Sequence, residues 1–490
     1  MIVLIESPYK VKSLKKALRL NGIEADVIAS NGRLFDLPDN NVGISESLSI
    51  DSFEPVNPAL FESIQAHLES HDDLYIATDP DDEGDLAAWT IARYRQSLPT
   101  YRVTLYDFTS VAVKVAFEGA SSVSMVEPAA LARRIFDRLL GYSGNDGMFL
   151  SRTAGAVLQL AANQAIPIKK VVNTVWDADG ACFNERYSNG QGAVVMPTLK
   201  PATGPLPQYS HCLGVGCEMG ETPKSVFAAL QELYTDGDIS YFRTSSGETN
   251  RSAISAMNAV ERDVGLDNLA SVDTGLDRHP HPGIYVTDGA ASDIKSKRQT
   301  PLAKRFHQLL LNSTLCAMAG RDDCRQVRKT EAGSTWSAQH YTVRGQTFSY
   351  PLSTHALGDD VMTGSPREWP HDRAFTIPKE GGIAMALIGS GVGHPSSWAS
   401  LSQNYACLID KNGNLSVRGS DFYRKHQLEA PALLSPENAR TIESILLNPN
   451  KPTAEKVLSA LDYCGLSLGD LNLKLSPDRG RTLSFSGPTP

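Results

Sequence analysis

The chain of 490 residues has few cysteines and no long apolar run. Its 7 cysteines form no CxxC pair, which excludes a zinc ribbon of the usual spacing and argues against a disulfide framework. No apolar run approaches the ~18 residues that a membrane-spanning helix needs. The N-terminal MIVLI has no basic segment before it, so it is typical of a buried strand and not of a signal peptide. We therefore expect a cytoplasmic protein without a membrane anchor.

Positive charge is also scarce, because 46 Lys and Arg residues face 55 Asp and Glu residues and leave a net charge of −9. That total gives no hint of a nucleic-acid partner. The charges are nevertheless unevenly distributed. Residues 8–19 and 295–305 each contain five basic residues and no acidic one, whereas residues 71–85 contain seven acidic residues. For each run taken alone, a solvated charged face is the alternative interpretation.

Over the first ~115 residues, short β-branched runs alternate with helical patterns. Strands separated by helices, each strand nearly continuously apolar, predict a parallel sheet covered on both faces. In such sheets chemistry gathers at the carboxyl ends of the strands, where Glu6 and Asp79 fall. The expected strands are 2–5, 26–30, 73–79 and 102–107, with a helix over 10–20.

The pattern then becomes mainly helical and later β-rich, and the length alone suggests roughly three or four domains. Helices are expected from about 125 to 185, over 224–237 with a stop at Gly237, and over 302–319. Antiparallel strands are expected over 334–375, further helices after them, and a loose polar tail from SPDRGRT onward.

The DPDDEGD segment places the carboxylates of Asp79, Asp81, Asp82 and Glu83 at a strand end. Such a cluster is costly unless a cation neutralises it, because neighbouring like charges raise one another's pKa. Mg²⁺ is a natural counter-charge, since it binds through one or two carboxylates together with water and phosphate oxygens. An acidic turn is the alternative. The spacing excludes a calcium loop of the EF-hand type.

Two further segments could supply a proton donor and a nucleophile. Glu6, near other carboxylates, is expected to have a raised pKa and could act as a general acid beside Lys10. Tyr241 could attack phosphorus, and Arg243 could hold a phosphate oxygen. Taken alone, Lys10 could open a solvated helix and Tyr241 could be an ordinary buried tyrosine. Tyr285 is a rival tyrosine that no arginine follows closely.

Segments along most of the chain resemble, in order, the motifs of the type IA DNA topoisomerases. MIVLIESPYKVKS is similar to VxVESPxKAKT, SNGRLFDLP to SxGHxxDLP, and LYIATDPDDEGDLAAW to ATDPDREGEAIAW, and these three form the Toprim module of that family. ARRIFDRLLGY resembles ARRxxDRxxGY, and TAGAVLQ is a poorer match to SAGRVQ. GDISYFRTSS resembles GxITYxRTDS, HPGIYVT resembles HxAIxPT, and GVGHPSSWA resembles GIGRPSTYA.

The resemblance implies an α/β plus mainly α fold arranged as a multidomain torus. A hinge at a β-rich arch would let the tyrosine-bearing domain swing away from the Toprim domain. The chain would be a monomer associated with the nucleoid, without the C-terminal zinc ribbons that many members carry. The implied parts are a Rossmann-like Toprim domain (1–120), a helical domain (121–188 and 376–490), the arch (189–222 and 334–375) and the tyrosine-bearing domain (223–333).

The implied activity is ATP-independent, Mg²⁺-dependent breakage and rejoining of one strand of negatively supercoiled DNA through a 5′-phosphotyrosine. The substrate would be single-stranded or easily melted DNA. No GxxxxGK[ST] loop occurs, which agrees with an enzyme that uses no nucleotide. Carried over by motif, the catalytic residues are Tyr241, Arg243, Glu6, Lys10 and His281, the metal ligands Asp79, Asp81 and Glu83, and the DNA-binding residues Arg33, Arg134 and Thr244.

Four positions depart from the family motifs. Asp82, Ala156 and His394 stand where the family has arginine, and Ser245 stands where it has aspartate. Each loss of positive charge should weaken phosphate binding. Two other functions therefore stay open, a DNA-binding accessory protein without turnover and a Toprim nuclease that needs the acidic cluster but not Tyr241.

Overall fold

The computed structural model describes most of the chain. The described residues are 1–96, 98–143, 152–163, 206–263, 282–287, 300–318, 379–393, 395–399, 401–478 and 484–485, together with the strand backbones at 169–172, 175–176, 182–183, 186–187, 324–331, 334–343, 346–350 and 373–376. His281 and His394 lie outside the described residues.

The N-terminal part is built on a five-stranded sheet with the strand order β2-β1-β5-β6-β7. Four strands are parallel, as predicted, and only β7 runs antiparallel to its neighbour β6. The fourth strand lies earlier than the expected 102–107, at Thr100–Arg102, and Val103 and Leu105 follow it as buried core residues. The strands are β1 (Ile2–Ile5), β2 (Asp26–Ala29), β5 (Leu74–Ala77), β6 (Thr100–Arg102) and β7 (Ser121–Ser122).

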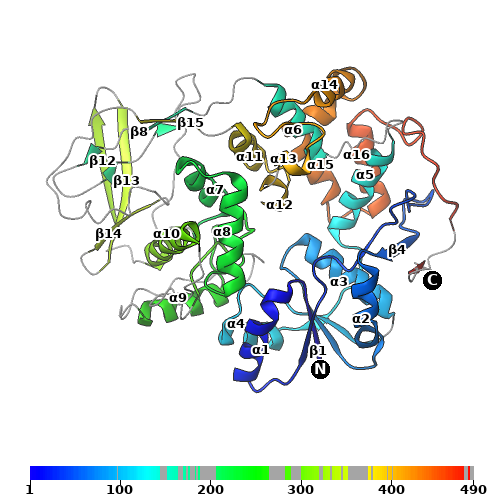
Figure 1. Ribbon diagram of the computed structural model, residues 1–490, viewed down its shortest axis with the longest axis horizontal. Coiled ribbons are helices and arrows are strands. Elements are labelled where there is room, and N and C mark those ends of the chain that lie inside the picture. The colour runs from blue at the N-terminus through cyan, green and yellow to red at the C-terminus, as the bar shows by residue number, and fades with distance from the viewer. Residues whose placement is uncertain are drawn as a thin grey trace.

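Helices cover both faces of this sheet (Figure 1). Alternate residues of β1 point to opposite faces, so Ile2 and Leu4 join one core and Val3 and Ile5 the other. The first core contains α2 (Pro58–Glu69) and α3 (Asp82–Arg95), and the second contains α1 (Val11–Leu20) and α4 (Ser110–Glu118).

A helical region lies next to the α3 side of this part (Figure 1). Glycine is needed at position 155, because a Cβ there would lie 1.9 Å from the carbonyl oxygen of Leu433. The α6 helix therefore packs closely against the turn η5 (Pro431–Leu434). The helices are α5 (Ala129–Tyr142), α6 (Arg152–Ala162), α11 (Lys379–Gly389), α12 (Pro395–Trp398), α13 (Leu401–Asn404), α14 (Val417–Glu429), α15 (Pro436–Leu446) and α16 (Thr453–Tyr463).

The expectation of helix up to about residue 185 is wrong beyond α6. Strands follow instead, and β8 pairs with β15 from a distant part of the chain. This long-range pairing leaves no local signal in the sequence, and it favours a start of the arch near Lys169. The strands here are β8 (Lys169–Val172), β9 (Val175–Trp176), β10 (Cys182–Phe183), β11 (Arg186–Tyr187), β12 (Cys324–Glu331), β13 (Ser334–Val343), β14 (Gln346–Tyr350) and β15 (Arg373–Thr376). The antiparallel pairing expected within 334–375 is present between β13 and β14.

Within the described residues, four helices belong to the part that contains Tyr241. They are α7 (Tyr209–Glu218), α8 (Pro223–Asp236), α9 (Arg251–Asp263) and α10 (Pro301–Met318), and the predicted helices over 224–237 and 302–319 are therefore confirmed. Gly237 ends α8 in the left-handed conformation, with φ of 81°, as the sequence indicated.

Contacts between helices join these parts in a closed circuit, consistent with a torus (Figure 1). The N-terminal part contacts the helical region through α3 and α5, and α11 of that region contacts α6 and α7. The circuit closes where α8 contacts the 3-10 turn η1 (Pro8–Lys10) and α9 contacts α4. Helix α8 therefore lies next to the carboxyl end of β1.

The C-terminal segment is only partly as expected, because it is not loose throughout. β16 (Ser484–Phe485) pairs in parallel with β4 (Ser52–Pro55), which also pairs with β3 (Phe35–Asp36). The Phe485 ring lies 5.1 Å from that of Phe35 and 5.8 Å from that of Phe53. In the part of the chain that is described, no helix is long and apolar enough to cross a membrane.

Candidate active site

The acidic turn after β5 lies beside the end of β1. Because Ile5 and Ala77 are paired in register, Glu6 and Asp79 follow the strands side by side. The backbone N–H of Asp79 donates to Oε1 of Glu6 at 3.0 Å. Asp81 caps α3 by accepting from the Gly84 N–H at 2.8 Å. Glycine is required at position 84, because a Cβ there would lie 1.9 Å from the Asp79 carbonyl oxygen.

Tyr241 reaches this turn from the other side of the circuit. The segment after α8 is fixed by a bridge between Ile239 and Val286, and the Tyr241 N–H donates to the Tyr106 carbonyl at 2.7 Å. The Tyr241 hydroxyl donates to Oδ2 of Asp81 at 2.5 Å, although 160 positions separate the two residues. The tyrosine is buried, with 2% of its surface exposed. The phenol is therefore in contact with the N-terminal acids.

Two cations share the carboxylate of Asp79. Lys10 Nζ lies 2.9 Å from Oδ1, and Nη1 of Arg243 lies 3.1 Å from Oδ2. Arg243 also donates to Oε1 of Gln231 at 2.8 Å, and Lys10 lies 3.9 Å from the ring centroid of Tyr234. Six of the residues expected in the site thus meet in one buried cluster, namely Glu6, Lys10, Asp79, Asp81, Tyr241 and Arg243.

The surroundings of the cluster shift the pKa values of its members. Burial, and secondarily the charge of Asp79, raises the pKa of Glu6 to about 7. Burial and the nearby charges of Asp79 and Asp81 raise the pKa of Tyr241 well above its usual value. Burial lowers the pKa of Lys10, opposed by Asp79. At neutral pH Glu6 therefore holds a proton in a large fraction of molecules, while Tyr241 stays protonated.

We expect Glu6→Gln to stabilise the protein at alkaline pH. The raised pKa means that the folded state holds a proton that the unfolded chain releases between about pH 4.5 and 7, so wild-type stability falls as pH rises through that range. Above pH 7 the variant should be more stable by about 3 kcal/mol, and below pH 4.5 the difference should vanish. Unfolding midpoints measured from pH 4 to 9 would test this, and a pH-independent difference would contradict the raised pKa.

The third expected metal ligand is turned away from the cluster. Glu83 accepts from Arg33 at 3.0 Å and lies 3.4 Å from Arg133. Among the described residues, no group of three or more His, Cys, Asp or Glu side chains is placed to hold a metal ion. Asp79 and Asp81 nevertheless offer the hard oxygen donors that Mg²⁺ prefers, and two carboxylates suffice for that ion. The donor chemistry of this pair fits Mg²⁺, with the Asp79 carboxylate now shared between two cations.

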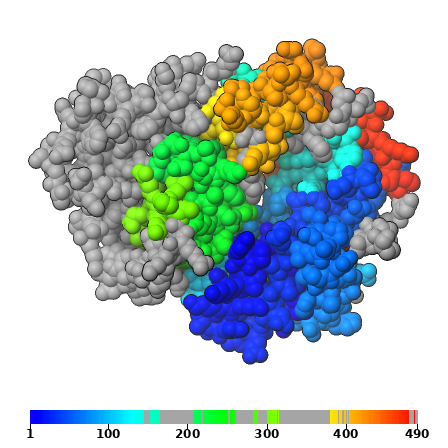
Figure 2. Space-filling model, viewed as in Figure 1, coloured from blue at the N-terminus to red at the C-terminus, as the bar shows by residue number. Residues whose placement is uncertain are grey.

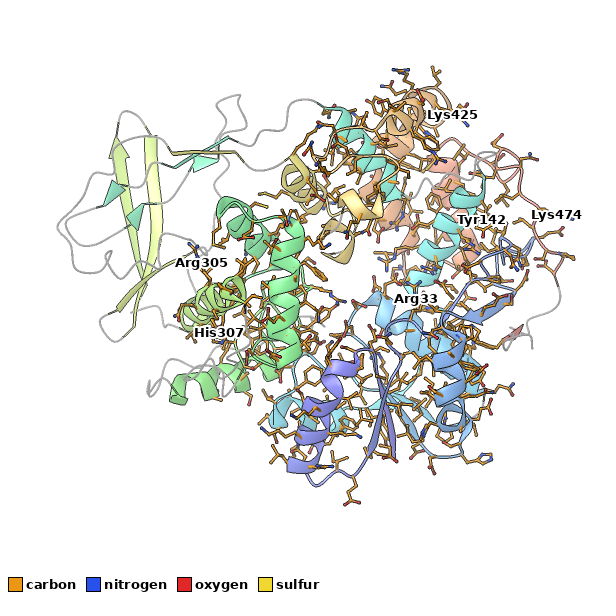
Figure 3. The ribbon with its side chains drawn as sticks, viewed as in Figure 1. Arg33, Tyr142, Arg305, His307, Lys425 and Lys474 are labelled. Carbon is orange, nitrogen blue, oxygen red and sulfur yellow. The ribbon has the colours of Figure 1, made fainter. Side chains whose placement is uncertain are left out.

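The three expected DNA-binding residues lie in different surroundings. Arg33 donates to Asp36 at 2.6 Å as well as to Glu83, and Arg134 also bonds to Asp36. Figure 3 shows Arg33 where the N-terminal part meets the helical region. Thr244 is buried, and its hydroxyl accepts from the Ser246 N–H at 3.0 Å. Arg33 and Arg134 are therefore paired with protein carboxylates, whereas Thr244 is bonded within its own segment.

Sequence reasoning missed three residues that position the cluster. Arg102 donates to the carbonyl oxygens of Thr78 and Asp79, at 2.9 Å each, and so holds the acidic turn in place. Gln231 and Tyr234 of α8 orient Arg243 and cover Lys10. Amphipathic spacing marks the α8 positions only as helical, so no local pattern could have identified their role.

Two of the departures from the family motifs are accommodated by local contacts. Asp82 lies 3.4 Å from Arg133, so an arginine at this position would face another arginine. Ala156 is fully buried in the helical core, where a charged side chain would lack solvent. Ser245 is exposed. Tyr285, the rival tyrosine, donates to Asp107 at 2.6 Å and is not bonded to the acidic turn.

Comparison with known proteins identifies the relationship. The model of the Toprim domain matches residues 1–107, which contain the acidic turn. A plasmid protein of Xylella fastidiosa (strain 9a5c), described as DNA topoisomerase I, is 23% identical over 491 aligned residues that cover 82% of this chain and 72% of that protein. Over most of its length the chain is therefore similar to proteins described as DNA topoisomerase I. The structure of full-length topoisomerase I from Thermotoga maritima has the same fold, with a TM-score of 0.64, 19% identity, and coverage of 96% of this chain and 90% of that one.

Proposed function

We propose that the chain breaks and rejoins one DNA strand through a covalent bond to Tyr241 and so relaxes negatively supercoiled DNA. The observation that carries the proposal is the hydrogen bond between the Tyr241 hydroxyl and Asp81. It brings the Tyr241 hydroxyl to the acidic end of the Toprim sheet. The relationship to topoisomerases agrees with this arrangement.

In the reaction, the Tyr241 oxygen attacks a backbone phosphorus and releases its hydroxyl proton to solvent, and the bond from that phosphorus to the 3′-oxygen breaks. A 5′-phosphotyrosine and a free 3′-hydroxyl result. One phosphoester replaces another of similar energy, so no nucleotide is needed to rejoin the strand. Glu6 gives its proton to the departing 3′-oxygen and takes it back when the strand is resealed, a role that suits a pKa of about 7.

Arg243 stabilises the charge on the phosphoryl oxygens during both steps. The Nε of Arg243 is buried and has no hydrogen-bond partner in the described part of the chain, so its N–H can donate to a phosphate oxygen. Lys10 holds the scissile phosphate or helps to position Glu6. His281, which the family motif adds to the site, completes the proposed catalytic set.

DNA can reach Tyr241 only after the parts of the circuit separate, because the phenol is 2% exposed. Separation breaks the bond to Asp81 and the ion pair between Arg243 and Asp79. We infer that the tyrosine-bearing part moves away from the Toprim domain, with the arch as the hinge. Arg33, Arg134 and Thr244 would contact the strand that enters.

Asp79 and Asp81 would hold Mg²⁺, with Glu83 joining if it leaves its arginine partners. When bound, the ion supplies a positive charge that positions phosphate oxygens near the broken end. Asp79 would thereby exchange its contacts with Lys10 and Arg243 for a contact with the metal, and those two cations would then face the DNA. The metal also offsets the repulsion between their carboxylates and the incoming phosphates.

A labelled oligonucleotide incubated with the protein and Mg²⁺ should give a conjugate that survives denaturation. Asp79→Ala combined with Asp81→Ala should remove Mg²⁺-dependent relaxation of a supercoiled plasmid, because the carboxylates that hold the ion are gone. A chelator should do the same to the wild type. Unchanged relaxation in chelator would contradict the metal assignment.

The same experiment distinguishes the two other functions. A DNA-binding accessory protein would bind the oligonucleotide but neither form the conjugate nor relax the plasmid. A Toprim nuclease would cut the strand without a bond to the protein, and Tyr241 would be dispensable. The contacts of Asp82 with Arg133 favour a chain that has adapted to its departures and keeps turnover.

A further inference from the structure

The first helix carries a row of exposed basic side chains that the proposed reaction does not use. Lys12, Lys16 and Arg19 are exposed on α1, and Lys15 is half-buried beside them. Their spacing places Lys12, Lys16 and Arg19 on one face of the helix, opposite the buried Leu14 and the rest of the core face. We call Lys12, Lys16 and Arg19 the α1 basic row.

Tyr9 stands at the start of this row. It lies in the 3-10 turn that leads into α1, and 77% of its surface is exposed. The next residue, Lys10, is buried in the active site against Asp79. An exposed aromatic ring and three cations therefore lead away from the reacting groups along a single helix.

The α1 basic row differs from the other charged helices of the chain. Lys114 and Lys425 each lie within 4.0 Å of a glutamate one turn further along their own helix, and Lys451, just before α16, lies 2.7 Å from Glu455 of that helix. Helix α1 contains no acidic residue, and among the described residues no ion pair involves Lys12, Lys15, Lys16 or Arg19. The chain as a whole has a net charge of −9, so a row of cations without acidic partners is unusual in it. This favours a binding surface over an ordinary solvated face.

The place of α1 beside the active site also favours a binding surface. The η1 turn contacts α8, which carries the residues around Arg243. Figure 2 shows the first residues of the chain, in dark blue, on the face toward the viewer and beside residues 206–263, in green. Arg33 pairs with Glu83, which follows the acidic turn, and lies where the N-terminal part meets the helical region (Figure 3). A strand that passes the site from the Arg33 side would leave it toward α1.

We propose that one flank of the bound single-stranded DNA leaves the active site along α1, with a base stacked on Tyr9 and phosphates bound by Lys12, Lys16 and Arg19. About 10 Å of helix separates Lys12 from Arg19 at ~1.5 Å per residue, which matches roughly three phosphates of a stacked strand at about 3.4 Å each. Aromatic stacking and a basic track are the two elements of sequence-tolerant binding to single strands. This proposal rests on the proposed function, because it takes DNA to be the substrate.

The test uses a triple variant, Lys12→Gln with Lys16→Gln and Arg19→Gln. The cleavage position in an oligonucleotide is first mapped with the wild type. Strands are then made that keep eight nucleotides on one side of that position and have either two or ten on the other. Affinity is measured by fluorescence anisotropy in the presence of a chelator, so that cleavage does not contribute. A matched control removes three exposed lysines elsewhere, through Lys411→Gln, Lys425→Gln and Lys474→Gln.

Figure 3 places Lys425 and Lys474 at edges of the molecule away from α1, and Lys411 is exposed. The control variant therefore changes the net charge equally without touching the α1 basic row. We expect the triple variant to bind one of the two kinds of long strand, the one extended on the side that lies along α1, about tenfold more weakly than the wild type does. The slope of log Kd against log salt concentration for that strand should be smaller by about 2. The variant's affinity for the strand shortened on that side should match the wild type. Tyr9→Ala should weaken the same long strand about tenfold.

Equal affinity of the triple variant and the wild type for every strand would overturn the proposal. So would a loss that is the same for short and long strands, or a loss that the control variant reproduces. If the wild type forms no covalent conjugate at all, the proposed reaction fails. The α1 basic row is then tested by the affinities for 10- and 18-nucleotide strands alone. The proposed binding along α1 stands only if the triple variant, and not the control variant, loses affinity for the 18-nucleotide strand and keeps it for the 10-nucleotide strand.

Discussion

Tyr241→Phe is expected to abolish the covalent DNA adduct while leaving the affinity for single-stranded DNA nearly unchanged. The substitution removes the oxygen that would bond to phosphorus and keeps the ring that packs against Tyr234 at 5.6 Å. Loss of a nucleophile removes the reaction and does not merely slow it, because the phenylalanine ring carries no oxygen that can bond to phosphorus. The adduct is measured as protein-bound label after denaturation, and affinity by anisotropy.

Tyr285→Phe is the matched control. That hydroxyl is also buried, and it donates to Asp107, not to the acidic turn. Each substitution removes one buried hydrogen bond to a carboxylate, so each should lower stability by a similar amount, about 1–3 kcal/mol. Only the change at Tyr241 should remove the adduct. An adduct that persists in Tyr241→Phe and disappears in Tyr285→Phe would move the nucleophile to the rival tyrosine.

The fold of the Toprim part could be predicted because its signals are local. Each apolar run of the central strands is short and is followed by a helical pattern, so Glu6 and Asp79 could be placed at strand ends before any pairing was known. Parallel neighbours then bring those ends together, as the register of Ile5 and Ala77 shows. The helix over 224–237 was equally predictable, because Gly237 marks its end.

The contacts that complete the site could not be predicted from spacing. Tyr241 and Asp81 are 160 positions apart, and Arg243 and Asp79 are 164 apart, so only the family resemblance brought them together beforehand. Glu83 shows the opposite case. Its motif predicts a metal ligand, but in the structure its carboxylate lies between two arginines that are distant in sequence. Charge partners of this kind depend on the packing of separate parts.

Asp79 balances the charges of the cluster. It is 6% exposed and lies between Lys10, 2% exposed, and Arg243. With Asp81 also charged and Glu6 holding a proton in many molecules, two carboxylates face two cations. Mg²⁺ would bring two positive charges and a backbone phosphate one negative charge, so the site would carry one more positive charge when both are bound.

Asp79→Asn is therefore expected to be the most destabilising of the active-site substitutions and to prevent adduct formation. It leaves the Lys10 ammonium buried without its nearest counter-charge, and breaking a buried pair in this way typically costs about 3–5 kcal/mol. The midpoint of thermal unfolding should fall by roughly 4 °C. The measurement is a thermal scan followed spectroscopically, with the adduct assay run at a temperature at which the variant is folded.

A second substitution separates the structural role of Asp79 from its chemical role. Lys10→Met together with Asp79→Asn replaces the ion pair by neutral groups of similar size, which removes the uncompensated charge and should recover much of the lost stability. It should recover no adduct, because Asp79 as metal ligand and Lys10 as phosphate-binding group are both absent. If instead the double variant were as unstable as Asp79→Asn, the cost would lie in the bond to Arg243 and not in the burial of Lys10. An adduct formed by the stable double variant would remove both residues from the proposed mechanism and leave Tyr241, Arg243 and Glu6 to carry it alone.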